Sequence, residues 1–204
     1  MYMSLEEELR DIIEQMKVRS RVEFEAGLSD EEASNIEILC NFRFPPDLRM
    51  FLQLAVPVRC HKPNNVEPSE QFPNWHKDPA EIMQWSREWA IGTFTFDIEN
   101  ARFWMPEWGK KPTALADQLA IATAYLQNVP LLIPIFAHRF LPAEPCEAGN
   151  PVFSIYQAID SIPYGYNLQK YLHNEFINHD NDAGRASNYR TIRFWSKITM
   201  EDIP

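Results

Sequence analysis

The placement of glycine constrains this chain more than any other feature. The 204-residue sequence contains only six glycines, and no two of them lie closer than 16 positions. Neither a G-x-G-x-x-G motif nor a P-loop can therefore be written, which excludes a phosphate-binding loop built from clustered glycines. The 16 prolines follow no period, and 45% of the residues are hydrophobic, which excludes a collagen-like or wholly disordered chain. With these classes excluded, the composition indicates a folded globular domain.

The chain is acidic, with a formal net charge of -10. This charge disfavours binding to nucleic acid or to an anionic membrane surface, because both depend on Lys and Arg. We expect neither partner. Residues 184–204 carry a net charge of +2, so the acidity belongs to the preceding residues. A docking face for a basic partner is therefore expected on the folded body, although solubility alone also explains an acidic surface.

The sequence favours a cytoplasmic location. Residues 1–10 are acidic and lack the apolar core of a signal peptide. The longest apolar run, residues 129–137, is too short to span a bilayer. Cys40, Cys60 and Cys146 are odd in number and widely spaced, which indicates reduced thiols rather than a disulfide framework.

Local signals predict several helices. Ser4-x-x-Glu7 and Ser29-x-x-Glu32 are capping boxes, and each precedes an apolar stripe at helical spacing. Pro46 is suited to the first position of a third helix. The predicted helices cover approximately residues 5–16, 30–40, 46–54, 79–87, 112–127 and 168–177.

Other segments predict strands. Phe94, Phe96 and Ile98 alternate with polar residues, which is typical of a strand over residues 93–98. Further strands are predicted over residues 102–105, 131–140 and 152–157. Pro134 should confine its strand to a sheet edge or a bulge. Residues 56–79 are interpreted as a long loop and residues 164–166 as a turn.

The order of these elements predicts an α+β fold. We expect a central, mostly antiparallel sheet flanked by helices, with the N-terminal helices first. We also expect a single domain over residues 1–177 and a C-terminal extension over residues 178–204.

Two carboxylates form the first candidate site. Asp97 and Glu99 lie two positions apart on the predicted strand and so share a face. The pKa values of two such carboxyl groups can separate, so that one acts as general acid and the other as general base. The other interpretation is that they form the solvated side of a half-buried strand.

Aromatic and basic residues supply the remaining candidates. Trp104 and Trp108 flank Pro106-Glu107, and indoles of this kind are enriched at binding hot spots, although they also build cores. His138 and Arg139 can act as a base with an anion clamp, or as structural hydrogen-bond donors. Trp85 and Trp89 lie four positions apart, which favours a place in the core.

Four strings of the sequence are distinctive, in chain order FPPDLRMFL (residues 44–52), TFDIENARFWMPEWG (95–109), LIPIFAHRFLP (132–142) and GNPVFSIYQ (149–157). Together they resemble sequences of the SUKH superfamily, named for its Smi–Knr cell-wall-assembly regulators. Phe44 stands where the family more often has leucine, and the last 25 or so residues lie outside the pattern.

The resemblance implies an α+β fold with no generally established catalytic residues. Bacterial members of the superfamily are similar to immunity proteins, which bind and neutralise polymorphic or contact-dependent toxins, often nucleases. We therefore expect a non-enzymatic bacterial immunity protein with a protein partner, a basic toxin domain being the favoured candidate, and no cofactor or metal. The candidate binding surface contains the residues singled out above, namely Asp97, Glu99, Trp104, Glu107, Trp108, His138 and Arg139.

Two alternatives stay open. One is a regulatory scaffold without a toxin partner, like the fungal members. The other is a small-ligand-binding protein or enzyme that uses a cleft around Asp97, Glu99 and Trp104.

Overall fold

The computed structural model describes residues 3–61, 71–178 and 189–200. These residues form an α+β architecture with two antiparallel sheets, which confirms the predicted fold class. The elements, in order, are α1 (Leu5–Arg19), β1 (Val22–Ala26), α2 (Asp30–Cys40), α3 (Pro46–Leu54), β2 (Ala55–Cys60), α4 (Pro79–Asn100), the 3-10 turn η1 (Pro106–Trp108), α5 (Leu115–Leu126), β3 (Leu132–Phe136), β4 (Arg139–Pro142), β5 (Val152–Ile155), β6 (Ser161–Gly165), α6 (Leu168–His173), the π-helical turn η2 (Asn174–Asn178) and α7 (Trp195–Met200).

The N-terminal helices begin where their local signals place them. The Ser4 hydroxyl accepts a hydrogen bond from the Glu7 backbone N–H, and the Glu7 carboxylate accepts one from the Ser4 N–H. Ser29 and Glu32 repeat this arrangement at α2. Both capping boxes are confirmed, as is the start of α3 at Pro46. The starts of α1 and α2 are therefore fixed by local hydrogen bonds, because each capping box satisfies free N–H groups at the start of its helix.

A two-stranded sheet connects the first helices. β1 pairs antiparallel with β2, so the prediction of a loop beginning at residue 56 is wrong for residues 56–60. Residues 62–70 of that predicted loop lie outside the described residues. Gly27 follows β1 where the chain passes close to the end of α3, and a Cβ at this position would lie 1.9 Å from the Gln53 carbonyl oxygen. Only glycine fits this approach.

The larger sheet has four antiparallel strands in the order β3-β4-β5-β6. Pro134 lies on the edge strand β3, beside a register shift, as predicted. The single strand predicted over residues 131–140 is a hairpin, because Ala137 and His138 turn the chain between β3 and β4. Tyr164 and Gly165 end β6 instead of forming the predicted turn.

Helix α4 replaces the strand predicted over residues 93–98. It extends through Asn100, and the buried side chains in this part are Phe94, Asp97 and Ile98 together with Thr93. That spacing is helical, and it leaves Phe96 exposed. The strand predicted over residues 102–105 is also wrong, since these residues are neither strand nor helix. Contacts with the sheet and with α5 override the local alternation.

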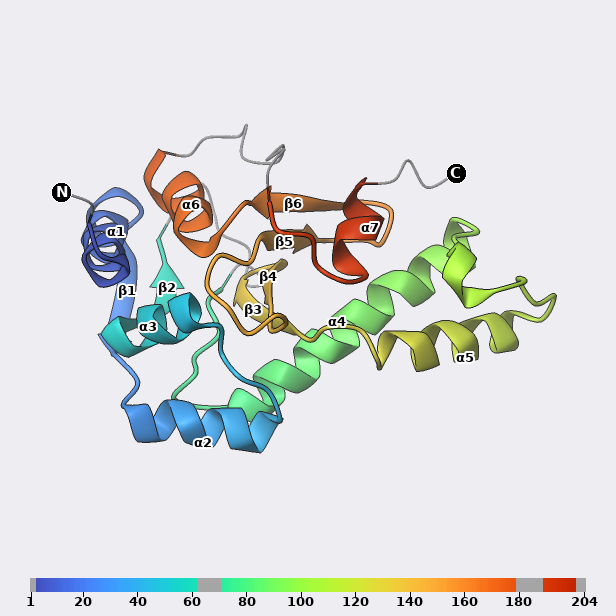
Figure 1. Cartoon of the computed structure of the whole chain (residues 1–204), viewed down its shortest axis with the longest axis horizontal. Helices are drawn as coiled ribbons and strands as arrows, with labels where there is room; N and C mark the ends of the chain where they lie inside the picture. The colour runs from blue at the N-terminus through green and yellow to red at the C-terminus, as the bar shows by residue number, and fades with distance from the viewer. Residues whose placement is uncertain (1–2, 62–70, 179–188, 201–204) are drawn as a thin grey trace.

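The four-stranded sheet separates two apolar cores, since successive strand residues point to opposite faces. In β4, Phe140 packs in one core and Leu141 in the other. The first core lies among α1, α2, α3, α6 and the two-stranded sheet. The second lies among the C-terminal half of α4, α5, β5 and α7. Figure 1 shows α4 running from beside α2 at one end of the molecule to α5 at the other.

The described part of the C-terminal segment packs against the body. Trp195 is buried in the second core, and its indole Nε1–H donates a 2.7 Å hydrogen bond to the Pro130 carbonyl. Ile192, Phe194 and Ile198 lie in the same core. Residues 189–200 of the predicted extension therefore contribute to the folded body.

Candidate functional site

Asp97 and Glu99 do not form a carboxylate pair. Both lie on α4, and two positions along a helix rotate a side chain by about 200°, so they occupy opposite faces. Asp97 is 1% exposed, whereas Glu99 is exposed. The prediction that they share one face of a strand is wrong, and with it the geometry required for an acid–base pair.

Asp97 instead connects two segments of backbone. Its Oδ2 accepts a hydrogen bond from the Ile159 N–H at 3.0 Å. Its carbonyl oxygen accepts bonds from the N–H groups of Ala101 and Phe103, where α4 ends. The carboxylate therefore ties the end of α4 to the chain between β5 and β6 through Oδ2, whereas its Oδ1 is buried with no hydrogen-bond partner among the described residues.

The Trp104–Trp108 segment lies just beyond the C-terminal end of α4. Trp108 is buried in the second core, and Trp104 is half-buried against it, with ring centroids 5.1 Å apart. The Trp104 Nε1–H donates to the Gly109 carbonyl at 2.7 Å. Glu107 forms an ion pair with Lys197, and the hydrogen bond from Lys197 holds the Glu107 pKa below its ordinary value. This segment thus couples η1 to α7.

His138 and Arg139 occupy different surroundings. Arg139 lies over the ring of Tyr164 in β6, 4.2 Å from its centroid. His138 lines a cavity, with its ring 5.5 Å from that of Tyr156. Burial, reinforced by the nearby Arg139 guanidinium, lowers the His138 pKa from about 6.5 to about 4. The imidazole is therefore neutral near pH 7.

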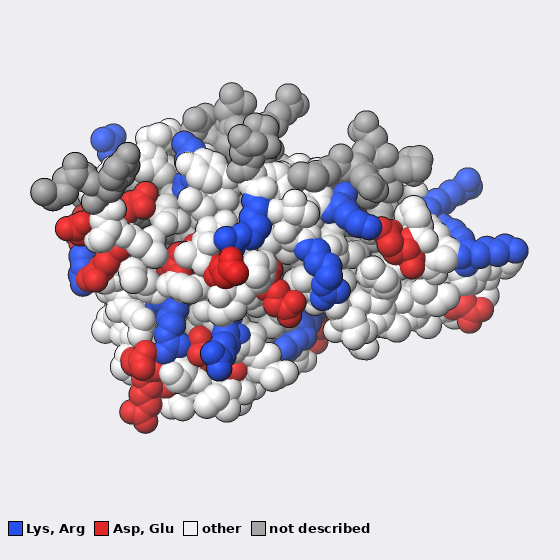
Figure 2. Space-filling model, viewed as in Figure 1, with Lys and Arg blue, Asp and Glu red and all other residues white. Residues whose placement is uncertain are grey.

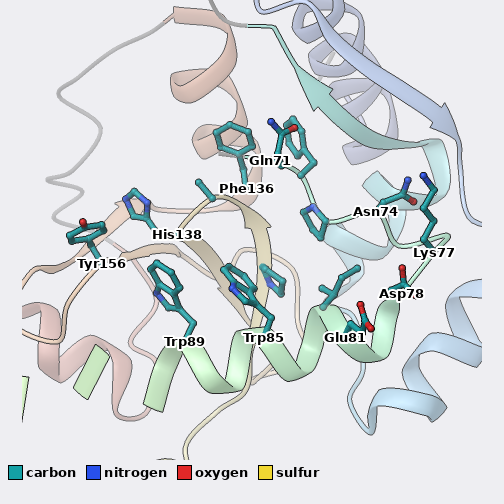
Figure 3. Close-up of a pocket in the computed structure, with 15 residues that line it drawn as sticks. Gln71, Asn74, Lys77, Asp78, Glu81, Trp85, Trp89, Phe136, His138 and Tyr156 are labelled. Atoms are coloured by element: carbon teal, nitrogen blue, oxygen red, sulfur yellow. The ribbon is translucent and has the colours of Figure 1, made fainter. Parts of the chain in front are cut away.

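The cavity that His138 lines has a volume of about 720 Å³. It lies between α4, the segment from Gln71 to Asp78, and the β3–β4 hairpin (Figure 3). A second hollow of about 550 Å³ continues along α4 and shares Trp85, Trp89 and Tyr156 with the first. We call the two together the aromatic groove. Its lining residues are Gln71, Phe72, Pro73, Asn74, Lys77, Asp78, Glu81, Ile82, Trp85, Glu88, Trp89, Gly92, Thr93, Phe96, Pro134, Phe136, Ala137, His138, Tyr156 and Gln157.

A ridge on α4 forms one wall of the aromatic groove. Glu81, Trp85 and Trp89 are spaced four apart, so their side chains lie one above another on the same helix face. Figure 3 shows the two indoles projecting from α4 toward the hairpin. The Trp85 ring stacks on Phe140, 5.8 Å between centroids, and the Trp89 Nε1–H donates to the Ile155 carbonyl at 2.7 Å. Both indoles are thus held in place by the sheet.

Large apolar side chains of the groove are accessible to solvent. Trp85 is 40% exposed, Phe96 49% and Tyr156 57%. The prediction that Trp85 belongs to the core is therefore wrong. Exposed apolar side chains gathered along one hollow are typical of a binding surface.

The sequence-predicted candidates contribute little to this groove. Of the seven, His138 lines it and the other six do not. Trp85, Phe96 and Tyr156 were missed as site residues, although the four-residue spacing of Glu81, Trp85 and Trp89 was a usable signal for one ridge. The sequence around Tyr156 gave no indication of a binding site. This residue follows β5, and only the fold brings that strand beside α4.

Within the described residues, no helix is both long and apolar enough to cross a membrane, and no three potential metal ligands cluster. Comparisons with known proteins found nothing similar: no protein-family model, no curated protein and no solved structure matches the chain. The likeness to the SUKH superfamily therefore rests on the four sequence strings and stays a prediction.

Proposed function

We propose that this chain is a protein-binding domain that docks its partner along the aromatic groove. The observation that carries the proposal is the exposure of Trp85, Phe96 and Tyr156 along one continuous hollow. Trp and Tyr are enriched among the residues that dominate binding energy at protein interfaces. Because the indoles are already held by Phe140 and Ile155, little side-chain freedom would be lost on binding.

We further propose that the partner is a toxin domain and that the protein is its immunity protein. The SUKH-like strings support this assignment, and the acidic chain suits a basic partner such as a nuclease. The separation of Asp97 from Glu99 across α4 supports a non-enzymatic function, since it removes the acid–base pair that the sequence suggested.

The test first asks whether the open reading frame beside this chain's gene encodes a toxin-like domain, and a domain of that kind is then the binding partner. Its affinity for the full chain is measured by calorimetry, and protection is measured by co-expression. The double variant Trp85→Ala with Phe96→Ala should weaken binding about tenfold or more and reduce protection. The matched control, Ile38→Ala with Leu39→Ala, removes two exposed apolar side chains of α2 outside the groove and should bind normally. Equal binding by both variants would overturn the proposal.

A small-ligand-binding protein is the second candidate. The 720 Å³ cavity falls in the range that small-molecule sites occupy, and most of its lining residues are apolar or aromatic. This candidate uses the aromatic groove rather than the cleft predicted around Asp97, Glu99 and Trp104. A metabolite that raises the melting temperature of wild type but not of the Trp85→Ala variant would favour it. A regulatory scaffold would also use the groove, but without protection from a toxin.

A further inference from the structure

We propose that the aromatic groove reads an arginine on an extended segment of its protein partner. The guanidinium would lie on the face of the Trp85 indole that Phe140 does not cover and reach the carboxylate of Glu81, one helical turn earlier. The inference rests on the proposed function of the groove as a protein-docking surface, and it adds the chemistry that would select the partner.

The groove has its own negative charge. Asp78, Glu81 and Glu88 line it, against the single basic side chain Lys77 among the described lining residues. In the part of the chain that the structure describes, no cation forms an ion pair with Asp78 or Glu81. The neutral His138 ring adds no opposing charge near pH 7. The carboxylates are therefore available to a cation from outside.

The local charge matters because the rest of the surface is mixed. Figure 2 shows Lys and Arg side chains interspersed with Asp and Glu over the face it presents. The net charge of -10 does not form one continuous acidic field on that face. A cation is then selected at individual sites, where carboxylates lie beside a second surface that also attracts it.

The aromatic rings supply that surface. The Trp85 and Trp89 ring centroids are 5.5 Å apart, and Glu81 precedes Trp85 by one helical turn. A cation over the face of an indole is attracted by the ring, and tryptophan is the best of the aromatic side chains for this purpose. Arginine suits the site better than lysine, because its planar guanidinium stacks on an aromatic ring while its N–H groups bond a carboxylate.

The length of the groove indicates a peptide segment rather than a lone cation. The groove follows α4 from Asp78 to Phe96, and 18 helical steps correspond to about 27 Å. An extended segment of about eight residues covers this distance. Its arginine would lie at the acidic end, where Figure 3 shows Asp78 and Glu81, and apolar residues would follow toward Phe96.

The test compares two small probes on the full chain. N-acetyl-arginine amide and N-acetyl-citrulline amide have nearly the same shape, but only the first is charged. The indole N–H resonances of Trp85 and Trp89 are followed in a titration by NMR. We expect saturable shifts with the arginine probe at millimolar concentration. The citrulline probe should bind at least about fivefold more weakly. Equal shifts from both probes, or none from either, would overturn the inference.

Matched variants locate the charge. Glu81→Gln should weaken binding of the arginine probe about threefold, as expected for an exposed ion pair. Glu31→Gln removes an exposed carboxylate of α2 outside the groove and should leave it unchanged. A third probe, tetramethylammonium, separates a peptide site from a site for small quaternary amines. Tighter binding of this ion than of the arginine probe would contradict the inference.

Two double variants, tested against the protein partner, separate this inference from the proposed function. If the Trp85→Ala and Phe96→Ala pair weakens partner binding while Glu81→Gln with Asp78→Asn does not, the groove docks the partner without reading an arginine. The inference then fails and the proposed function stands. If neither pair weakens binding, both fail. Weakening by both pairs supports both.

Discussion

The Asp47 carboxylate, at the start of α3, accepts a hydrogen bond from the backbone N–H of Gly149, 102 positions later in the chain, at 2.9 Å. Its other oxygen accepts the Leu48 N–H at 3.0 Å. Asp47 is fully buried, and burial raises its pKa even though both hydrogen bonds act in the opposite direction. One carboxylate thus fixes α3 against the loop that leads into β5.

Replacing Asp47 by asparagine should destabilise the fold by about 1–3 kcal/mol. The amide keeps the shape but has only one acceptor oxygen, so it cannot serve the N–H groups of both Gly149 and Leu48. Chemical denaturation measures the change. Asp160→Asn, at an exposed position, is the control and should stay within about 0.5 kcal/mol of wild type. Equal effects at the two positions would contradict the structural role of Asp47.

Two glycine substitutions should have opposite effects. Gly27→Ala places a Cβ 1.9 Å from the Gln53 carbonyl oxygen, which should cost about 1–3 kcal/mol or more. Gly92→Ala adds a Cβ with no atom within 4 Å, inside α4, and should stabilise the protein by up to about 1 kcal/mol. Urea unfolding of the two variants checks the sign of each change. The same sign for both would be incompatible with this packing.

Removing the Trp195 side chain should disrupt the second core. Trp195→Ala eliminates a buried indole and its bond to Pro130, with an expected loss of about 3–5 kcal/mol in unfolding free energy. Trp85→Ala removes a 40% exposed indole and should cost distinctly less. Thermal unfolding of both variants provides the comparison. If Trp195→Ala proves harmless, α7 does not stabilise the body.

The two carboxylates of the predicted pair should respond differently to mutation. Asp97→Ala leaves the Ile159 N–H without its acceptor and should cost about 1–3 kcal/mol. Glu99→Gln alters an exposed side chain and should change stability by less than about 0.5 kcal/mol. Denaturant unfolding and partner affinity are both measured, and neither change should affect affinity in the folded protein. A loss of affinity in Glu99→Gln would instead indicate that the face of α4 carrying Glu99 contacts the partner.

The low pKa of His138 makes stability depend on pH. The folded-state pKa of about 4 lies below the ordinary value near 6.5, so the unfolded chain binds the proton more readily between these values. Stability should therefore be fully present above about pH 6.5 and fall as the pH drops toward 4. His138→Gln should show a smaller decrease over this range. An NMR titration of the imidazole that gave a pKa near 6.5 would refute the expectation.

The sequence predicts the parts of this fold that depend on local chemistry. The capping boxes at Ser4 and Ser29 and the Pro46 helix start are correct, since their hydrogen bonds and dihedral limits arise within a few residues. The second half of α4 was mispredicted because Phe94, Phe96 and Ile98 satisfy a strand pattern. Burial of Phe94, Asp97 and Ile98 against distant segments decides for the helix.

The candidate site was less predictable than the fold. The aromatic groove combines residues from α4, from the segment before it, from β3 and from the turns that follow β3 and β5. No local sequence pattern predicts that these segments lie together. The charge argument stays a prediction: no observation tests whether a basic partner docks on the body of the chain. Under the proposed function, Asp78 and Glu81 would be among the carboxylates that meet such a partner.

Helix α4 belongs to both cores at once: Met83 packs in the first, and Phe94 and Ile98 in the second. Its 22 residues correspond to about 33 Å of continuous hydrogen-bonded backbone. If either core unfolds, α4 loses part of its packing, and the other core also depends on α4. The two cores should therefore unfold in one cooperative transition. A ligand bound along the groove-facing ridge of α4 would then stabilise the helix beside both cores and raise their shared melting temperature.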